Sequence, residues 1–158
     1  MRLYQITSSF TRPNDAIAYA VSDMVANSTN PGDVVPLTWN VPQGFLLTAV
    51  SMSKSNTANH PQFLLYLYQF KPTHPAGDNT AYITDLSGYL GSVFIDMNPS
   101  PRFNDFCYGF GPVDPNLIPL FTDTVQANQG NVYGLLQTTS GFATIANETF
   151  TVNLIGVD

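Results

Sequence analysis

Charged side chains are scarce in this sequence. Lys and Arg together number five among 158 residues, and Glu148 is the single glutamate beside ten aspartates. Helix surfaces usually carry Glu, Lys and Arg, which lose little rotamer freedom in a helix, so the shortage disfavours a helical protein. The formal net charge of −6 disfavours nucleic-acid binding, which needs a Lys/Arg patch to displace counterions from phosphate. The same charge disfavours an anionic membrane surface.

Long apolar runs and cysteine pairs are also missing. The longest apolar stretches are short pieces such as Phe45–Leu47 and Phe63–Tyr68, below the roughly 18 residues that a membrane helix needs. The start, Met1–Gln5, turns polar at once and lacks the apolar core of a signal peptide. Cys107 is the lone cysteine, which excludes an intrachain disulfide and gives no hint of an oxidising compartment. We therefore expect a protein without a membrane partner.

The common catalytic signatures do not occur. The sequence has no G-x-S-x-G elbow, P-loop, H-E-x-x-H or Cys-x-x-Cys. Cys107 with His60 or His74 could pair a nucleophile with a base. A buried cysteine and two loop histidines beside prolines explain these residues better, because free cysteine is among the most buried residue types. We expect no enzyme activity, no catalytic residues and no cofactor.

Two pairs of aspartates raise the question of a metal site. Asp78 with Asp85, or Asp114 with Asp123, could bind Ca²⁺ through loop oxygens. Neither pair has the dense alternating acid spacing of an EF-hand loop. Asp is a frequent turn and capping residue, so these roles are favoured and no metal is expected.

The residues that are plentiful predict an all-β fold. Thr, Tyr, Phe and Val suit a pleated surface, while Asp, Asn, Gly and Pro suit turns. The spacing of short apolar segments and turns indicates one domain over residues 1–158, an antiparallel β-sandwich of jelly-roll type. The predicted strands are Val34–Trp39, Gly44–Ser53, Gln62–Phe70, Ser92–Met97, Asn131–Thr138 and Thr149–Val157.

Details within these segments add further expectations. Pro36 cannot donate to a sheet ladder, which places the Val34–Trp39 strand at an edge or an irregularity. In Gly44–Ser53 the alternation sets Leu46, Val50 and Met52 on one face. Gln62–Phe70 is apolar on both faces and indicates a central strand.

Two segments do not read as strands. Thr84 and Asp85 can cap one helical turn near 85–90, which Gly91 can end. Asn98–Pro119 carries five prolines and is expected to be a long irregular excursion, a kind of loop that is usually functional or forms an interface.

Aromatic residues make up 13% of the chain, with eleven Phe, eight Tyr and one Trp. Most are expected in the core, where each buries a large area. Exposed Tyr or Trp39 could instead stack on a sugar. So many tyrosines beside so little charge would also suit a protein–protein interface.

The stretch before residue 30 holds an unusual charged turn. Arg12 is followed by Pro13, which fixes one dihedral, and by Asn14 and Asp15, whose side chains can close a turn. Beyond it we expect two short extended pieces joined by a turn at Ser22–Asp23, with a helix from Ala16 as the alternative. The Arg12 guanidinium either pins the turn within its own domain or trimer or contacts a partner.

The same stretch resembles a known family. Four segments of the sequence resemble, in their order, those of small structural proteins of tailed bacteriophage virions. These segments are FTRPNDAIAYAVSDMVANST (Phe10–Thr29), LTAVSMSKSN (Leu47–Asn56), FLLYLY and DNTAYITDLSGYLGSVFIDM (Asp78–Met97). The resemblance covers Phe10 to Met97 and ends there. Two departures are visible: Ser22–Asp23 stands where Gly-Asp is commoner, and the proline-rich excursion looks like an insertion.

The resemblance implies a non-enzymatic capsid decoration, or cement, protein. Such a protein binds the major capsid protein on the head surface of the virion, commonly as a homotrimer, after assembly in the host cytoplasm. The residues implied as structural or partner contacts are Phe10, Arg12, Asn14, Asp15 and Tyr19. The alternative is a carbohydrate- or receptor-binding β-sandwich, such as a tail-associated adhesin or a lectin-like domain.

Overall fold

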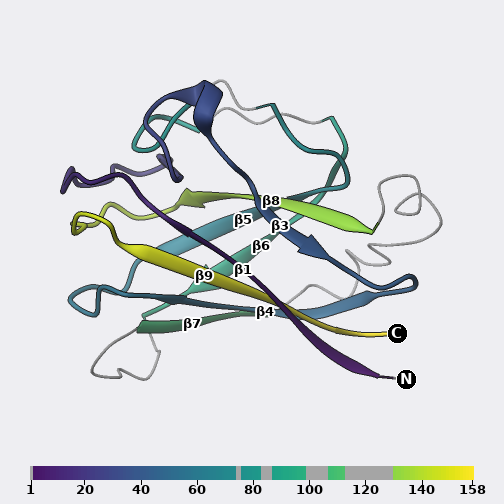
Figure 1. The fold of residues 1–158 in the computed structure, drawn as a ribbon. Helices are drawn as coiled ribbons and strands as arrows, with labels where there is room; N and C mark the ends of the chain where they lie inside the picture. The colour runs from purple at the N-terminus through teal and green to yellow at the C-terminus, as the bar shows by residue number, and fades with distance from the viewer. Residues whose placement is uncertain (1, 74–75, 83–86, 99–106, 113–129) are drawn as a thin grey trace.

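The computed structural model describes residues 2–73, 76–82, 87–98 and 130–158, together with the backbone of 107–112 (Figure 1). In this part of the chain nearly every regular element is a strand, so the all-β prediction is confirmed. A single 3-10 turn, η1 (Pro31–Asp33), is capped by the Asn30 side chain. The strands are β1 (Leu3–Thr11), β2 (Met24–Val25), β3 (Leu37–Asn40), β4 (Leu46–Lys54), β5 (Gln62–Tyr68), β6 (Tyr89–Asp96), β7 (Cys107–Pro112), β8 (Asn131–Thr138) and β9 (Thr149–Val157).

The strands form two antiparallel layers with the main core between them. The hydrogen-bonded order is β1-β9-β4-β7-β6-β5-β8-β2, and β3 also pairs with β8. The two halves of this path join through a single residue pair, Asp96 with Phe110, between β6 and β7. The path therefore folds over at that point, and the predicted antiparallel sandwich is confirmed.

Trp39 lies at the centre of the core. Its side chain is fully buried, and its indole Nε1 donates to the Val152 carbonyl oxygen of the opposite layer at 3.1 Å. Gly134 makes room for the ring, because a Cβ there would lie 2.6 Å from a Trp39 ring atom. A role for Trp39 as an exposed sugar platform is therefore wrong.

Several details of the strands differ from expectation. Residues 34–36 are not part of a strand, and β3 begins after Pro36. Pro36 has no N–H to donate to a neighbouring strand. In β4 a bulge between Leu47 and Ala49 reverses the alternation, so Leu46 is 41% exposed instead of sharing the face of Val50 and Met52. Residues 89–90, expected at the end of a helical turn, begin β6, while 83–86 lie outside the described residues.

Two strands were not predicted. β1 is an edge strand whose alternate residues are exposed, and it pairs with β9 along its whole length, from Leu3 opposite Val157 to Thr11 opposite Thr149. β7 interrupts the expected irregular excursion Asn98–Pro119 and pairs with β4. The rest of that excursion, 99–106 and 113–119, lies outside the described residues.

A second apolar cluster lies outside the main core. Met24, Ala26, Tyr68 and Leu135 form it, and segment 24–30, which supplies the first two, lies antiparallel beside segment 76–82. The two segments are held together by backbone hydrogen bonds from Asp78 N to Ser28 O (2.7 Å) and from Asn79 N to Met24 O (2.9 Å). This pairing places Asp78 within reach of Arg12, which follows β1.

No helix in the described ranges is long and apolar enough to cross a membrane.

Candidate functional site

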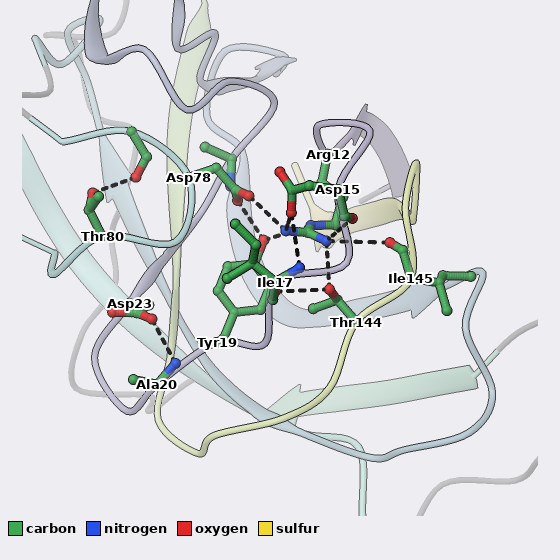
Figure 2. A network of polar contacts seen from close by, with 12 residues as sticks. Arg12, Asp15, Ile17, Tyr19, Ala20, Asp23, Asp78, Thr80, Thr144 and Ile145 are labelled. Carbon is green, nitrogen blue, oxygen red and sulfur yellow. Dashed lines mark hydrogen bonds and ion pairs between the residues drawn. The ribbon is translucent and has the colours of Figure 1, made fainter.

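Arg12 follows β1 and is buried, with 1% of its surface exposed. Its backbone N–H donates to Glu148 O at 3.0 Å, which anchors the turn beside β9. Its guanidinium donates to Asp15 Oδ1 (2.9 Å), Asp15 O (2.8 Å) and Thr144 Oγ1 (2.6 Å). These contacts match the structural alternative stated above, in which the guanidinium bonds carbonyls and an Asp within its own domain (Figure 2).

Asp78 is the buried counter-ion of Arg12. Its Oδ2 accepts from Arg12 Nη2 at 3.0 Å, and both side chains are fully shielded from solvent. Its Oδ1 accepts from the Tyr19 hydroxyl (2.5 Å) and from Ala26 N (2.8 Å). This ion pair joins positions 66 residues apart and is more than the turn or capping role expected for Asp78.

Tyr19 completes the network. Its hydroxyl accepts from Arg12 Nε at 3.1 Å while it donates to Asp78. Its backbone pairs with Phe142 in an isolated bridge, and the two rings lie 4.9 Å apart. The chain then turns at Ser22, where φ is 73°, into β2. The predicted arrangement of two extended pieces around Ser22–Asp23 is thus confirmed, and the helix alternative from Ala16 is wrong.

Burial governs the protonation of this network. Desolvation raises the pKa of Asp78, although hydrogen bonds from Ala26 and Tyr19 and the charge of Arg12 oppose that rise. Desolvation and the neighbouring Asp78 carboxylate raise the pKa of Tyr19 far above its ordinary value. Tyr19 therefore stays protonated and serves as a hydrogen-bond donor, which suits a structural contact and not acid–base chemistry near neutral pH.

The network carries two exposed isoleucines on its outer side. Ile17 is 58% exposed and Ile145 is 47% exposed. Thr144 Oγ1 accepts a hydrogen bond from Arg12 and donates one to Ile17 O at 3.0 Å. Arg12 Nη1 also donates to Ile145 O at 3.4 Å. Arg12 therefore holds the Ile145 backbone directly and the Ile17 backbone through Thr144 (Figure 2). We call Ile17 and Ile145 the isoleucine pair.

A second buried ion pair lies beside this site. Lys54, at the end of β4, donates to Glu148 Oε1 at 3.1 Å, and both side chains are fully shielded. Lys54 Nζ also donates to Asn56 O (2.5 Å) and Asn59 Oδ1 (2.9 Å). Neither Lys54 nor Glu148 was predicted as a site residue, because nothing in the local sequence shows that they meet.

Glu148 makes folding stability depend on pH in an unusual direction. Burial raises its pKa above the ordinary value of 4.5, against the opposing charge of Lys54. The folded state then binds more protons than the unfolded state between the two pKa values. The stabilising contribution of Glu148 is therefore complete below its ordinary pKa, that of the unfolded state. It is lost as the pH rises through the raised pKa of the folded state.

We expect Glu148→Gln to remove that part of the pH dependence. Urea unfolding at steps between about pH 4 and about pH 8 would measure it, and the free energy of unfolding of the variant should fall less with rising pH than that of the wild type. The exposed Asp33→Asn is the matched control and should keep the wild-type slope. If the free energy of unfolding of Glu148→Gln changes with pH as steeply as that of the wild type, Glu148 is not the source of this pH dependence.

The predicted contact residues fall into one neighbourhood. Phe10 stacks on Phe150 with ring centroids 5.4 Å apart and packs against the main core. Asn14 is exposed, and its Oδ1 accepts from Asn147 Nδ2 at 2.9 Å. Asp15 also accepts from Ile17 N at 3.1 Å, which closes the turn. Arg12 contacts both Asp15 and Tyr19 directly. Phe10 and Asn14 flank these three residues.

The other candidates form no comparable cluster. Within the described residues no group of three His, Cys, Asp or Glu side chains could hold a metal ion. His60 lies in the loop before β5, as expected. His74, Asp85, Asp114 and Asp123 lie outside the described residues, as does the side chain of Cys107.

Comparisons with known proteins add little. The chain matches no protein-family profile and no curated protein. Among solved structures it is similar to "a putative glycoside hydrolase" from Bacteroides thetaiotaomicron VPI-5482, at 11% sequence identity and a TM-score of 0.36. The match covers 82% of this chain and 42% of the other. A similarity this low carries no argument about fold or activity.

Proposed function

We propose that this protein is a non-enzymatic structural component of a bacteriophage virion, a decoration protein that binds the major capsid protein on the head surface. The sequence resemblance over Phe10–Met97 supports this class. The segment that carries its first motif, Phe10–Thr29, supplies Arg12, Asp15 and Tyr19 to the buried network. In this proposal the motif shapes a contact surface and does not perform chemistry.

The isoleucine pair is the observation that carries the proposal. Ile17 and Ile145 expose apolar side chains on loops whose backbones are locked by Arg12 and Thr144. A preorganised loop loses little conformational entropy when a partner covers it, so more of the contact energy remains for binding. Two large aliphatic side chains on loops held this way suit the apolar centre of a protein–protein interface.

Decoration of a shell needs many modest contacts and not one very strong one. A homotrimer would present three copies of the isoleucine pair to neighbouring capsid subunits. Linked binding sites raise the effective concentration of each further contact, so avidity can exceed the affinity of one site by about 10²–10⁴. Bridging of this kind would hold adjacent subunits together against internal pressure.

The test is co-sedimentation with purified capsids. We expect the wild-type protein to sediment with heads and not with tails, and Ile17→Asp combined with Ile145→Asp to weaken binding about 100-fold or more. Each isoleucine contributes about 1.5–3 kcal/mol when buried, and a buried unpaired carboxylate adds a further cost. Leu3→Asp is the matched control: Leu3 is 77% exposed and lies at the opposite end of β1.

Two results would count against the proposal. If the wild-type protein stays monomeric and binds no capsid at micromolar concentration, the decoration role is wrong. If Leu3→Asp weakens binding as much as the double variant, the isoleucine pair is not the contact surface. Circular dichroism spectra of all variants should match, because each change is made at an exposed position.

A carbohydrate-binding function is favoured by one different surface. Tyr89 and Phe94 of β6 are 37% and 46% exposed, and Tyr66 lies between Tyr82 and Tyr89, with ring centroids 4.5 and 6.2 Å away. Stacked aromatic rings at a surface suit the apolar face of a sugar. Glycan-array binding that is lost in Tyr89→Ala would favour this function. If the protein binds no glycan, decoration remains the one proposed function.

A further inference from the structure

An amine, a carboxamide and a carboxyl group lie together at the end of β4. They belong to Lys54, Asn59 and Glu148. Lys54 Nζ lies 2.9 Å from Asn59 Oδ1 and 3.1 Å from Glu148 Oε1. The Phe142 ring covers the amine, with its centroid 5.9 Å from Nζ. Lys54 is 1% exposed and Glu148 is fully buried, so the amine and the carboxyl group are shielded from bulk water, while Asn59 is half-buried.

We propose that Lys54 and Asn59 join in an intramolecular isopeptide bond, with Glu148 as the group that transfers the proton. The reaction occurs once in each folded chain and is a self-modification. It needs no cofactor, oxidant or second substrate, and it is independent of the proposed role on the capsid.

The atoms balance without any co-reactant. A proton first passes from the Lys54 ammonium to the Glu148 carboxylate, which leaves a neutral amine beside a neutral acid. Lys54 Nζ attacks Asn59 Cγ, the Nζ–Cγ bond forms and the Cγ–Nδ2 bond breaks. Glu148 gives its proton to the departing Nδ2 and takes one from Nζ, so ammonia leaves. Nothing is oxidised or reduced.

The geometry favours this reaction over a permanent ion pair. The Asn59 carbonyl carbon is one bond from an oxygen that already lies 2.9 Å from Nζ, and held reactants of this kind react as if at very high concentration. Burial raises the pKa of Glu148, which favours the protonated acid that the first step needs. Its Oε2 is buried and has no hydrogen-bond partner within the described residues, and a buried polar atom of this kind calls for an explanation.

The leaving group has both a support and an exit. Asn59 Nδ2 donates to the Ala143 carbonyl oxygen, which holds the amide in place. Asn59 itself is half-buried, so ammonia can depart from its side chain without crossing the core. Asn56 Oδ1 accepts from Ala58 N at 2.9 Å and shapes the turn that returns Asn59 to Lys54.

Intact-mass spectrometry of the purified wild-type chain tests the proposal. We expect a mass about 17 Da below that of the sequence, the loss of one ammonia. Tandem mass spectrometry of a proteolytic digest should place the loss on a peptide in which Lys54 and Asn59 are joined. A full sequence mass after prolonged incubation of the folded protein would overturn the proposal.

Variants separate the cross-link from succinimide formation, which also removes ammonia from asparagine. Lys54→Met and Glu148→Gln should both show their full calculated mass, while Lys71→Met, the matched control at an exposed lysine, should keep the loss. A loss that persists in Lys54→Met would overturn the proposal. If Lys54→Met does not fold, the position of the loss in the wild-type digest decides the question by itself.

Discussion

Replacing Arg12 with alanine is expected to lower the free energy of unfolding by about 3–5 kcal/mol, a large part of the stability of an ordinary domain. The reason is that Asp78 would be left as a buried carboxylate without its cation. The hydroxyls of Tyr19 and Thr144 would lose their shared partner at the same time. Urea unfolding followed by circular dichroism measures the change.

Two further variants sharpen this result. Arg12→Lys keeps the charge but has no planar fork, and it cannot reach Asp15, Asp78, Tyr19 and Thr144 together, so it should recover only part of the loss. Arg2→Ala, at an exposed arginine, should change the stability by no more than about 0.5 kcal/mol. Wild-type stability in Arg12→Ala would show that the network does not hold the two loops.

Gly77→Ala is expected to be comparably destabilising, by several kcal/mol, for a backbone reason. A Cβ at Gly77 would lie 2.0 Å from the Thr29 carbonyl oxygen, and no side-chain rotation can relieve a clash with backbone. Segments 24–30 and 76–82 would have to separate where they pair. The adjacent Asp78 would then be drawn away from Arg12, and thermal unfolding should occur at a lower temperature.

Gly32→Ala is the matched control for that change. The nearest atom to a Cβ at Gly32 is Asn30 Oδ1 at 3.8 Å, an ordinary contact. Its stability should stay close to that of the wild type. A double variant, Gly77→Ala with Arg12→Ala, should lose less than the sum of the two single losses, because both act through the same ion pair. Full additivity would contradict the link between Arg12 and the pairing of these two segments.

The strands that could be predicted are those whose pattern is local. β8 and β9 begin and end at the expected residues, since each has a continuous β-rich run bounded by turn residues. β1 was missed because it lies at an edge and buries none of its residues fully, which leaves a weak apolar signal. β7 was hidden among prolines, and its place in the sheet depends on pairing with the distant β4.

The candidate site shows the same division. The turn chemistry of Pro13, Asn14 and Asp15 is local, and it singled out Arg12. The partner across the network, Asp78, is 66 residues away, and its proximity arises only when segments 24–30 and 76–82 pair. The Lys54–Glu148 pair spans 94 residues. Pairings of this kind follow from topology, which single-sequence patterns do not encode.

The register of β1 with β9 also determines when the fold can be completed during synthesis. β1 is made well before β9, the strand with which it pairs, with Leu3 opposite Val157. Until residues 149–157 have left the ribosome, the backbone polar groups of β1 have no ladder partner, and an unpaired edge is where chains associate wrongly. Such distant pairing places this fold among the slow folders, with times of milliseconds to seconds. Burial of Arg12, whose N–H donates to Glu148 O beside β9, waits for the same event.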